Sequence, residues 1–264
     1  MEIIILSTAQ EVGTYSAEIM ADAVRHNPQA VWGVATGSSP IKTYEHLAEL
    51  VRDGLDVSAV KAFALDEYVE IPEGHPESYR AVINREIVEK IGLQAQNVHV
   101  LNGQAQDVQV ECAAYEQRIK DAGGVDVQLL GIGANGHIGF NEPGSSLVSR
   151  TRIKTLAPRT REDNARFFDD DIKQVPIHCL TQGIGTIMES QKIVLVAQGK
   201  SKARAIAQMV EGPIGTYCPA SILQMHPEVT IVIDEDAASE LTYTEYYRYA
   251  QQEKPEWQKP RYDQ

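Results

Sequence analysis

The chain has 264 residues, of which 43% are hydrophobic and 23% charged, and its net charge is −13. This composition suits one large α/β domain and argues against a disordered or fibrous protein. The acidic charge disfavours nucleic acids and anionic membranes as partners. No apolar run is long enough for a signal peptide or a membrane span. The widely spaced Cys112, Cys179 and Cys218 predict reduced thiols in a cytoplasmic protein.

Apolar runs alternate with amphipathic stretches along nearly the whole chain. We expect strands at 3–6, 31–35, 60–65, 98–101, 127–130, 149–156, 175–180, 192–197 and 229–233. We expect helices at 9–25, 43–51, 78–91, 106–121, 181–189 and 199–210. The alternation predicts a single α/β domain over residues 1–264, with a largely parallel sheet covered by helices on both faces. A tyrosine-rich tail from about residue 243, with Trp257, fits a docked terminal helix or a subunit contact.

Two expected strands end in polar residues. The strand at 31–35 runs into a turn with small side chains, Thr36, Gly37, Ser38 and Ser39. Amides and hydroxyls at the start of a helix can bind an anion, although the same pattern fits a simple helix cap with Pro40 at the first position. The strand at 60–65 ends at Asp66 and Glu67. The carboxyl ends of parallel strands are where open α/β sheets bind ligands, but a solvated pair in a loop is the alternative.

A glycine-rich stretch follows the strand at 127–130. It contains a literal G-x-G-x-x-G at Gly131, Gly133 and Gly136. A dinucleotide site needs a helix from the third glycine, and Gly139 and Pro143 interrupt that helix. The stretch therefore argues against dinucleotide binding.

The same glycines suit a loop that aims His137 into a cleft. Gly136 lets the backbone turn sharply, and Glu142 lies five residues after the histidine. A carboxylate on one ring nitrogen would fix the tautomer and leave the other nitrogen to transfer a proton. The alternative is a structural histidine whose hydrogen bonds are all made within a tight loop.

Basic residues concentrate between 150 and 166 in an otherwise acidic chain. They are Arg150, Arg152, Lys154, Arg159, Arg161 and Arg166. A local charge opposite to the global one favours anion binding over a merely solvated face. A Gly-Lys-Ser run at 199–201 lacks the upstream glycine of a P-loop, and the histidines lack metal-ligand spacing, so we expect neither a P-loop NTPase nor a metal site.

Several of these motifs, taken in order, resemble the glucosamine-6-phosphate deaminase family. The matching runs are Leu65 to Tyr68, His75 to Tyr79, Gly131 to Pro143, and Ser149 to Thr155, and the likeness covers about residues 3–233. The related 6-phosphogluconolactonases are not expected to carry both L-D-E-Y and H-I-x-F-N-E-P. The resemblance implies a modified Rossmann-like sheet of the isomerase/CoA-transferase type.

The resemblance implies that glucosamine 6-phosphate and water become fructose 6-phosphate and ammonia, without a metal or an organic cofactor. It makes Asp66 the base that moves a proton from carbon 2 to carbon 1. His137, oriented by Glu142, suits the opening of the sugar ring. Arg166 and Lys202 match the family's phosphate-binding cations, beside the turn at Thr36.

One position departs from the family pattern. Many members carry an aspartate where this chain has Asn135. An amide can donate and accept hydrogen bonds but carries no charge. We therefore expect a less charge-stabilised His137 and a pH optimum shifted from that of the aspartate members.

Some members of the family are hexamers that N-acetylglucosamine 6-phosphate activates. The positions that match their effector site are Ser145, Arg152 and Lys154. The resemblance thus implies a homo-oligomer, with a hexamer as one form, and leaves allosteric activation open. Two other functions also stay open: a non-catalytic sugar-phosphate sensor, and an NADP-dependent reductase. Binding alone requires no base, so the presence of Asp66, His137 and Glu142 argues against the sensor.

Overall fold

The computed structural model describes residues 1–255, so the predicted position of Trp257 lies outside the described residues. Its main sheet has seven strands, and every neighbouring pair is parallel. In spatial order the strands are β1 (Glu2–Leu6), β10 (Val229–Asp234), β9 (Lys192–Ala197), β6 (Val127–Leu130), β2 (Val31–Val34), β3 (Lys61–Ala64) and β5 (Val98–His99). The predicted parallel sheet is confirmed.

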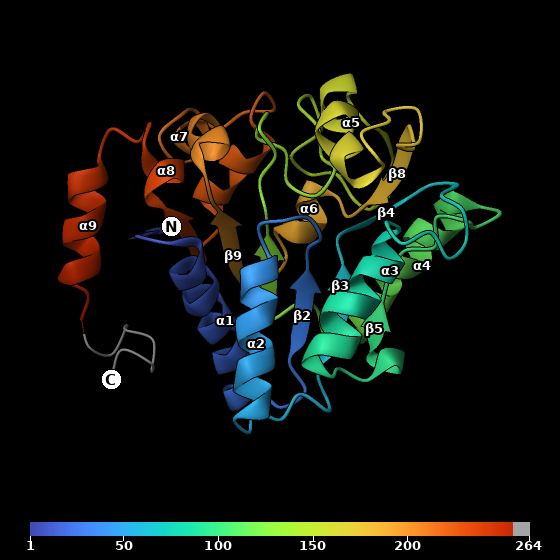
Figure 1. The fold of residues 1–264 in the computed structure, drawn as a ribbon, viewed down its shortest axis with the longest axis horizontal. Helices are drawn as coiled ribbons and strands as arrows, with labels where there is room; N and C mark the ends of the chain where they lie inside the picture. Colours follow the sequence, from blue (N-terminus) through green and yellow to red (C-terminus); the bar gives the residue numbers. More distant parts are fainter. Residues whose placement is uncertain (256–264) are drawn as a thin grey trace.

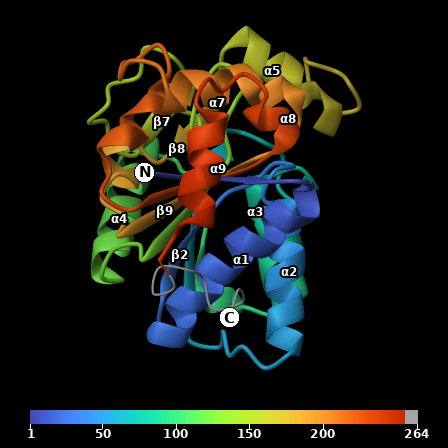
Figure 2. The ribbon, with the colours of Figure 1, turned by 90° about the vertical axis from the view of Figure 1, so that its left-hand side faces the viewer.

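Both faces of this sheet are covered, which is why its strands read as nearly continuous apolar runs. One face packs on α1 (Ala9–His26), α2 (Ile41–Arg52) and a π-helix (Asn84–Glu89). The other packs on α4 (Val108–Asp121), α7 (Ala203–Val210), α8 (Glu235–Ala238) and a 3₁₀-helix (Pro219–Met225). Figures 1 and 2 show α1 and α2 together on one side of the strands.

The order of the strands creates a crevice between β2 and β6. From β2 the chain passes outward to β3 and β5, and it then returns to β6 on the other side of β2. Loops diverge where the order reverses, and open α/β sheets bind ligands there, outside the carboxyl ends of the strands. Figure 1 shows β2 and β9 pointing toward the end of the molecule where α5 (Pro158–Asn164) lies.

A second sheet, with three antiparallel strands, lies at this end. It consists of β4 (Asp66–Tyr68), β8 (His178–Thr181) and β7 (Arg152–Thr155) in that order. The sequence predicted strands near β7 and β8, but not their separation from the main sheet or the pairing of Asp66 with Thr181. A three-residue strand has too little apolar alternation to be recognised. This sheet holds Asp66 just beyond the end of β3.

Some predicted helices differ from those observed. The helix expected at 78–91 is α3 (Tyr79–Ile83), which continues as the π-helix. The helix expected at 181–189 is only α6 (Ile184–Ile187), because Thr181 belongs to β8. The segment from Gly199 begins with a 3₁₀ turn (Lys200–Lys202) before α7. Two further 3₁₀ turns are present: Ala95–Asn97 precedes β5, and Ala165–Phe167 follows α5.

The tail forms a docked helix, α9 (Thr244–Gln252), which lies against the edge strand β1 (Figure 2). The Gln251 side chain accepts a hydrogen bond from the Ile5 backbone N–H at 3.3 Å, and Lys254 pairs with Glu2 at 2.6 Å. Of the two interpretations of the tail, the docked helix is thus confirmed.

Among the helices of residues 1–255, none combines the length and apolarity needed to cross a membrane.

Candidate active site

A cavity of about 380 Å³ lies at the crevice between β2 and β6. It brings together many of the site residues that the sequence predicted: Thr36, Gly37, Ser38, Ser39, Asp66, His137, Arg166 and Lys202. These residues come from five separate segments, which the fold assembles at the carboxyl edge of the sheet. The cavity is therefore the candidate active site.

The turn at Thr36–Ser39 leaves the start of α2 open to the cavity. Pro40 occupies the N-cap position, and no side chain caps the helix. This differs from the alternative interpretation, in which the hydroxyls cap the helix and Pro40 is its first residue. Gly37 has a φ of 94°, a left-handed conformation that favours glycine. Unpaired amides at the start of a helix, with hydroxyls in front, form a site for an anion.

Two cations face this anion site. Arg166 and Lys202 both line the cavity, and the Lys202 ammonium donates to the Ile132 carbonyl at 2.7 Å, which fixes its position. Burial and the nearby Arg166 lower the pKa of Lys202, while Asp163 acts in the opposite direction. A bound dianion would relieve the mutual repulsion of the two cations.

The other basic residues of the 150–166 segment have structural partners. Arg161 donates to the carbonyls of Ile172 and Val175, both at 2.8 Å. Arg159 is exposed and pairs with Asp163 at 3.1 Å. Of the predicted anion-binding segment, Arg166 thus lines the cavity, whereas these two arginines are engaged by other partners.

The glycine-rich loop, which we define as residues 131–143, turns tightly around His137. Gly136 has a φ of 82°, and no helix begins there. A Cβ atom at Gly133 would lie 2.2–2.4 Å from three ring atoms of His137. Gly136 makes the turn, and Gly133 leaves the space for the imidazole. The need for Gly133 depends on side-chain packing and could not be read from the sequence.

The predicted site residues Asn135 and Glu142 lie outside the cavity lining and contact His137 from behind. The Asn135 amide donates to Glu142 Oε2 at 2.8 Å, and its carbonyl accepts from the His137 backbone N–H at 3.2 Å. His137 Nδ1 lies 3.7 Å from the same Oε2, an ion-pair distance that is too long for a hydrogen bond. Nδ1 is buried and has no hydrogen-bond partner within residues 1–255.

The charge of Glu142 is well stabilised. Burial alone would raise its pKa, but His137, Thr160 and Asn135 lower the pKa of Glu142 to about 2. Its Oε1 also accepts from the Ala157 backbone N–H at 3.2 Å. Glu142 is therefore a fixed negative charge beside the imidazole.

Asp66 is in the opposite situation. It is buried, it lines the cavity, and within the described residues its carboxylate accepts no hydrogen bond. Burial, and next the charge of Glu67, raise the pKa of Asp66 well above its usual range. A carboxylate that is destabilised in this way binds a proton strongly, as a general base must.

Other polar groups on the cavity wall were not selected from the sequence. They are Glu77, Tyr79, Arg85, Thr160, Asp163 and Asn164. Tyr79 ends the H-P-E-S-Y run, and Arg85 belongs to the π-helix, a feature frequent at functional sites. The H-P-E-S-Y match was the one signal that could have identified Glu77 and Tyr79.

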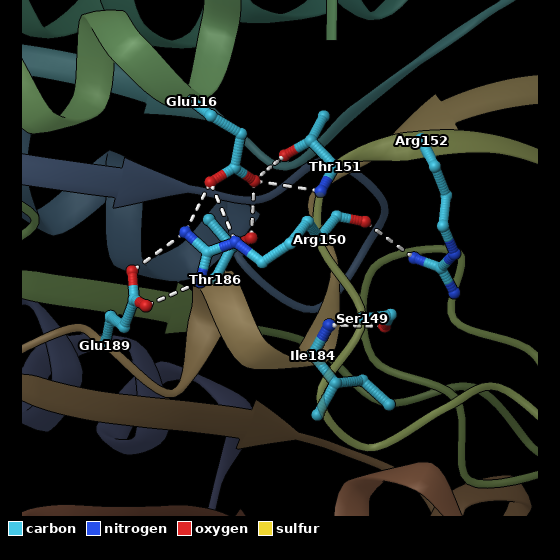
Figure 3. Close-up of polar contacts among 8 residues, drawn as sticks. All are labelled: Glu116, Ser149, Arg150, Thr151, Arg152, Ile184, Thr186 and Glu189. Atoms are coloured by element: carbon cyan, nitrogen blue, oxygen red, sulfur yellow. Dashed lines mark hydrogen bonds and ion pairs between the residues drawn. The ribbon is translucent and has the colours of Figure 1, made fainter. Parts of the chain in front are cut away.

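The three predicted effector positions lie outside the cavity lining. Arg152 donates to Asn141 Oδ1 at 2.9 Å. It also donates to the Arg150 carbonyl at 3.2 Å (Figure 3). Ser145 is buried, and its hydroxyl has no hydrogen-bond partner in the described part of the chain. Lys154 is half-buried on β7.

The segment before β7 is held by a single carboxylate on α4. Glu116 accepts from the Thr151 backbone N–H at 2.8 Å, from the Thr186 hydroxyl at 2.5 Å and from Arg150 Nε at 3.1 Å (Figure 3). Arg150 also pairs with Glu189 at 2.5 Å. Arg150 is thus paired with two carboxylates, Glu116 and Glu189, and does not act as the predicted anion ligand.

Among residues 1–255, no group of three His, Cys, Asp or Glu side chains could hold a metal ion.

The chain is similar to known proteins over nearly its whole length. Residues 6–232 match the family model described as glucosamine-6-phosphate isomerases/6-phosphogluconolactonase. A glucosamine-6-phosphate deaminase of Bifidobacterium longum subsp. infantis is 54% identical over 266 aligned positions, covering 97% of this chain and 98% of the relative. One of Streptomyces coelicolor is 53% identical, covering 98% and 99%.

Solved structures agree as well. A protein described as a monomeric glucosamine-6-phosphate deaminase superposes with a TM-score of 0.88 at 42% identity, covering 91% of this chain and all of that one. A 6-phosphogluconolactonase from Trypanosoma brucei has a TM-score of 0.73 at 17% identity over 91% and 98%, a likeness of fold alone. The chain belongs to the glucosamine-6-phosphate isomerase/6-phosphogluconolactonase family.

Proposed function

We propose that the protein converts glucosamine 6-phosphate and water to fructose 6-phosphate and ammonia. One observation carries the proposal: a base, a histidine and an anion site with two cations line the same cavity. The names of the relatives at 53–54% identity support the substrate. The phosphate would bind to the turn at Thr36–Ser39, Arg166 and Lys202, which fixes the other end of the sugar near Asp66 and His137.

The first step opens the sugar ring. His137 would take the proton of the anomeric hydroxyl and return one to the ring oxygen, which gives the free aldehyde. Glu142 would stabilise the imidazolium that forms between these transfers, and Asn135 would hold Glu142 in place.

The second step moves a proton from carbon 2 to carbon 1. Asp66 would remove the proton from carbon 2 while a proton is added to the carbonyl oxygen, which gives an enolamine. Asp66 would then deliver its proton to carbon 1, which gives a protonated imine at carbon 2. The desolvated carboxylate of Asp66 supports this role, because a carboxylate at its ordinary pKa is a weak base toward carbon. Addition of water to the imine and departure of ammonia leave the ketose.

The decisive measurement is ammonia release from glucosamine 6-phosphate. We expect activity in the wild type and a loss of at least about a hundredfold in Asp66→Asn, which keeps the shape but lacks the base. Asp56→Asn, at an exposed aspartate in the loop before β3, is the matched control and should keep full activity. An inactive wild type that still binds the sugar phosphate would instead favour the non-catalytic sensor.

We also propose a cytoplasmic homo-oligomer, with a hexamer as one form, and an effector site at Ser145, Arg152 and Lys154. The unpartnered hydroxyl of Ser145 and the exposed side chains of Val148 and Ile153 in the same region support it. The solved relative at 42% identity is described as a monomer, so this part needs its own test. Sedimentation as a monomer, with hyperbolic kinetics unaffected by N-acetylglucosamine 6-phosphate, would refute it.

A further inference from the structure

The buried carboxylate of Glu67 follows the proposed base directly, and the reaction as described does not use it. Its Oε1 accepts from the backbone N–H groups of Tyr68 and Tyr79 at 2.8 and 2.9 Å, and its Oε2 accepts from that of Arg80 at 2.9 Å. The exposed fraction of Glu67 is 4%. Three N–H donors on one carboxylate stabilise its ionised form.

The two adjacent carboxylates thus have opposite environments. Burial raises the pKa of Glu67, but the three N–H groups and the Arg80 guanidinium act against the increase. Asp66 has no such donors within the described residues, and burial together with the Glu67 charge raises its pKa well above the usual range. In a pair of this kind, the stabilised carboxylate stays ionised and the destabilised one binds the proton.

The cavity that Asp66 lines also holds the charged side chains of Glu77, Arg85, Asp163, Arg166 and Lys202, but Glu67 is the charge that raises the pKa of Asp66. Tyr68 and Tyr79, together with Tyr115 of α4 and Cys179 of β8, interact with Asp66, and burial raises the pKa of each, so all four are neutral near pH 7. His137 lines the same cavity, with Glu142 behind it.

We propose that Glu67 stays ionised inside the protein and acts as a positioning residue whose charge makes Asp66 a stronger base toward the proton on carbon 2. Two of these hydrogen bonds, those from Tyr79 and Arg80, tie β4 to the start of α3, and so hold Tyr79 at the cavity wall. This inference rests on the proposed role of Asp66, and its electrostatic part can be measured without turnover.

The test is a carbon-13 NMR titration of the aspartate carboxyl groups, with Asp66 identified as the signal that Asp66→Asn lacks. Removal of the neighbouring charge in Glu67→Gln should lower the midpoint of Asp66 by about one pH unit. The acidic limb of kcat/KM should move down by the same amount, and the plateau should fall because the base is weaker. The matched control is Glu18→Gln, at a buried glutamate on α1 paired with Arg25, which should change neither.

An unchanged Asp66 midpoint in Glu67→Gln would overturn the inference, even if activity fell, because a merely structural role would give that result. If Glu67→Gln does not fold, a carbon-13 titration of the glutamate carboxyl groups in the wild type can test the inference. Every glutamate carboxyl of the wild type should already be ionised at pH 7, and one that titrates above pH 7 would overturn the inference. An enzyme without ammonia release would refute the proposed function, but the NMR midpoints would still report the coupling of the two carboxylates.

Discussion

The Asn135 amide donates a 2.8 Å hydrogen bond to the Glu142 carboxylate, which lies 3.7 Å from Nδ1 of the His137 ring. The same side chain accepts from the His137 backbone N–H, so it joins the two partners of the proposed ring-opening pair. The sequence singled out Asn135 because many family members have an aspartate there. The structure gives the amide a role that a carboxylate could fill only with an extra proton.

Replacement of Asn135 by aspartate should therefore change the pH dependence. Two carboxylates at hydrogen-bond distance cannot both ionise freely, so the pKa of Glu142 should rise from about 2. We expect the added negative charge beside His137 to move one limb of the pH–rate profile by about one unit. Asn135→Ala, which loses the donor without adding a charge, is the control and should move the limb less. A profile with both limbs in place in Asn135→Asp would contradict this reasoning.

Glu142 should also contribute to stability in a pH-dependent way. Its pKa of about 2 in the folded protein lies below the ordinary 4.5, so its contribution is complete above pH 4.5 and disappears as the pH falls toward 2. We expect Glu142→Gln to lower the unfolding free energy by about 2–3 kcal/mol at pH 7, and by less at pH 3. Urea unfolding at both pH values measures this, with the exposed Glu240→Gln as control. A cost that does not depend on pH would exclude the electrostatic explanation.

Gly133→Ala tests the space reserved for the imidazole. The added methyl group would overlap the His137 ring, which must then leave its position. We expect kcat to fall by about a hundredfold, because a displacement of about 1 Å in a catalytic group has effects of this size. Gly215→Ala, where no atom lies within 4 Å of the new methyl group, is the control and should keep kcat. Normal turnover in Gly133→Ala would show that the ring position does not matter.

The two cations at the cavity should act on substrate affinity. A charge-assisted hydrogen bond contributes about 1.5–3 kcal/mol, so Arg166→Gln or Lys202→Gln should raise KM by about tenfold to a hundredfold. The loss should be larger for Lys202, which is fixed by the Ile132 carbonyl. Arg159→Gln, at an exposed arginine on α5, should leave KM alone. If kcat fell and KM stayed constant, these cations would not be holding the phosphate.

The parallel sheet was predictable because its strands are buried on both faces and read as apolar runs. The motifs also indicated Asp66, His137 and the turn at Thr36, which all line one cavity in the structure. Their arrangement follows from the strand order, since the carboxyl ends of parallel strands share one edge.

The remaining features depend on contacts that are distant in sequence. Nothing local marks the strand that carries Asp66, because it exists through its pairing with Thr181. Arg150 and Arg161 looked like anion ligands, but Glu116 and two backbone carbonyls, respectively, engage them. The partner of a charged side chain is set by tertiary packing, and composition does not reveal it.

The position of α9 against β1 affects how easily two copies of the protein could pair through the edges of their sheets. β1 is the last strand on its side of the main sheet, and such an edge offers unpaired backbone groups to any other extended chain. Gln251 of α9 occupies one of these groups at Ile5, and the Lys254–Glu2 pair holds the chain just beyond the helix at the same edge. The docked helix therefore opposes sheet-to-sheet aggregation, a protection that is separate from catalysis.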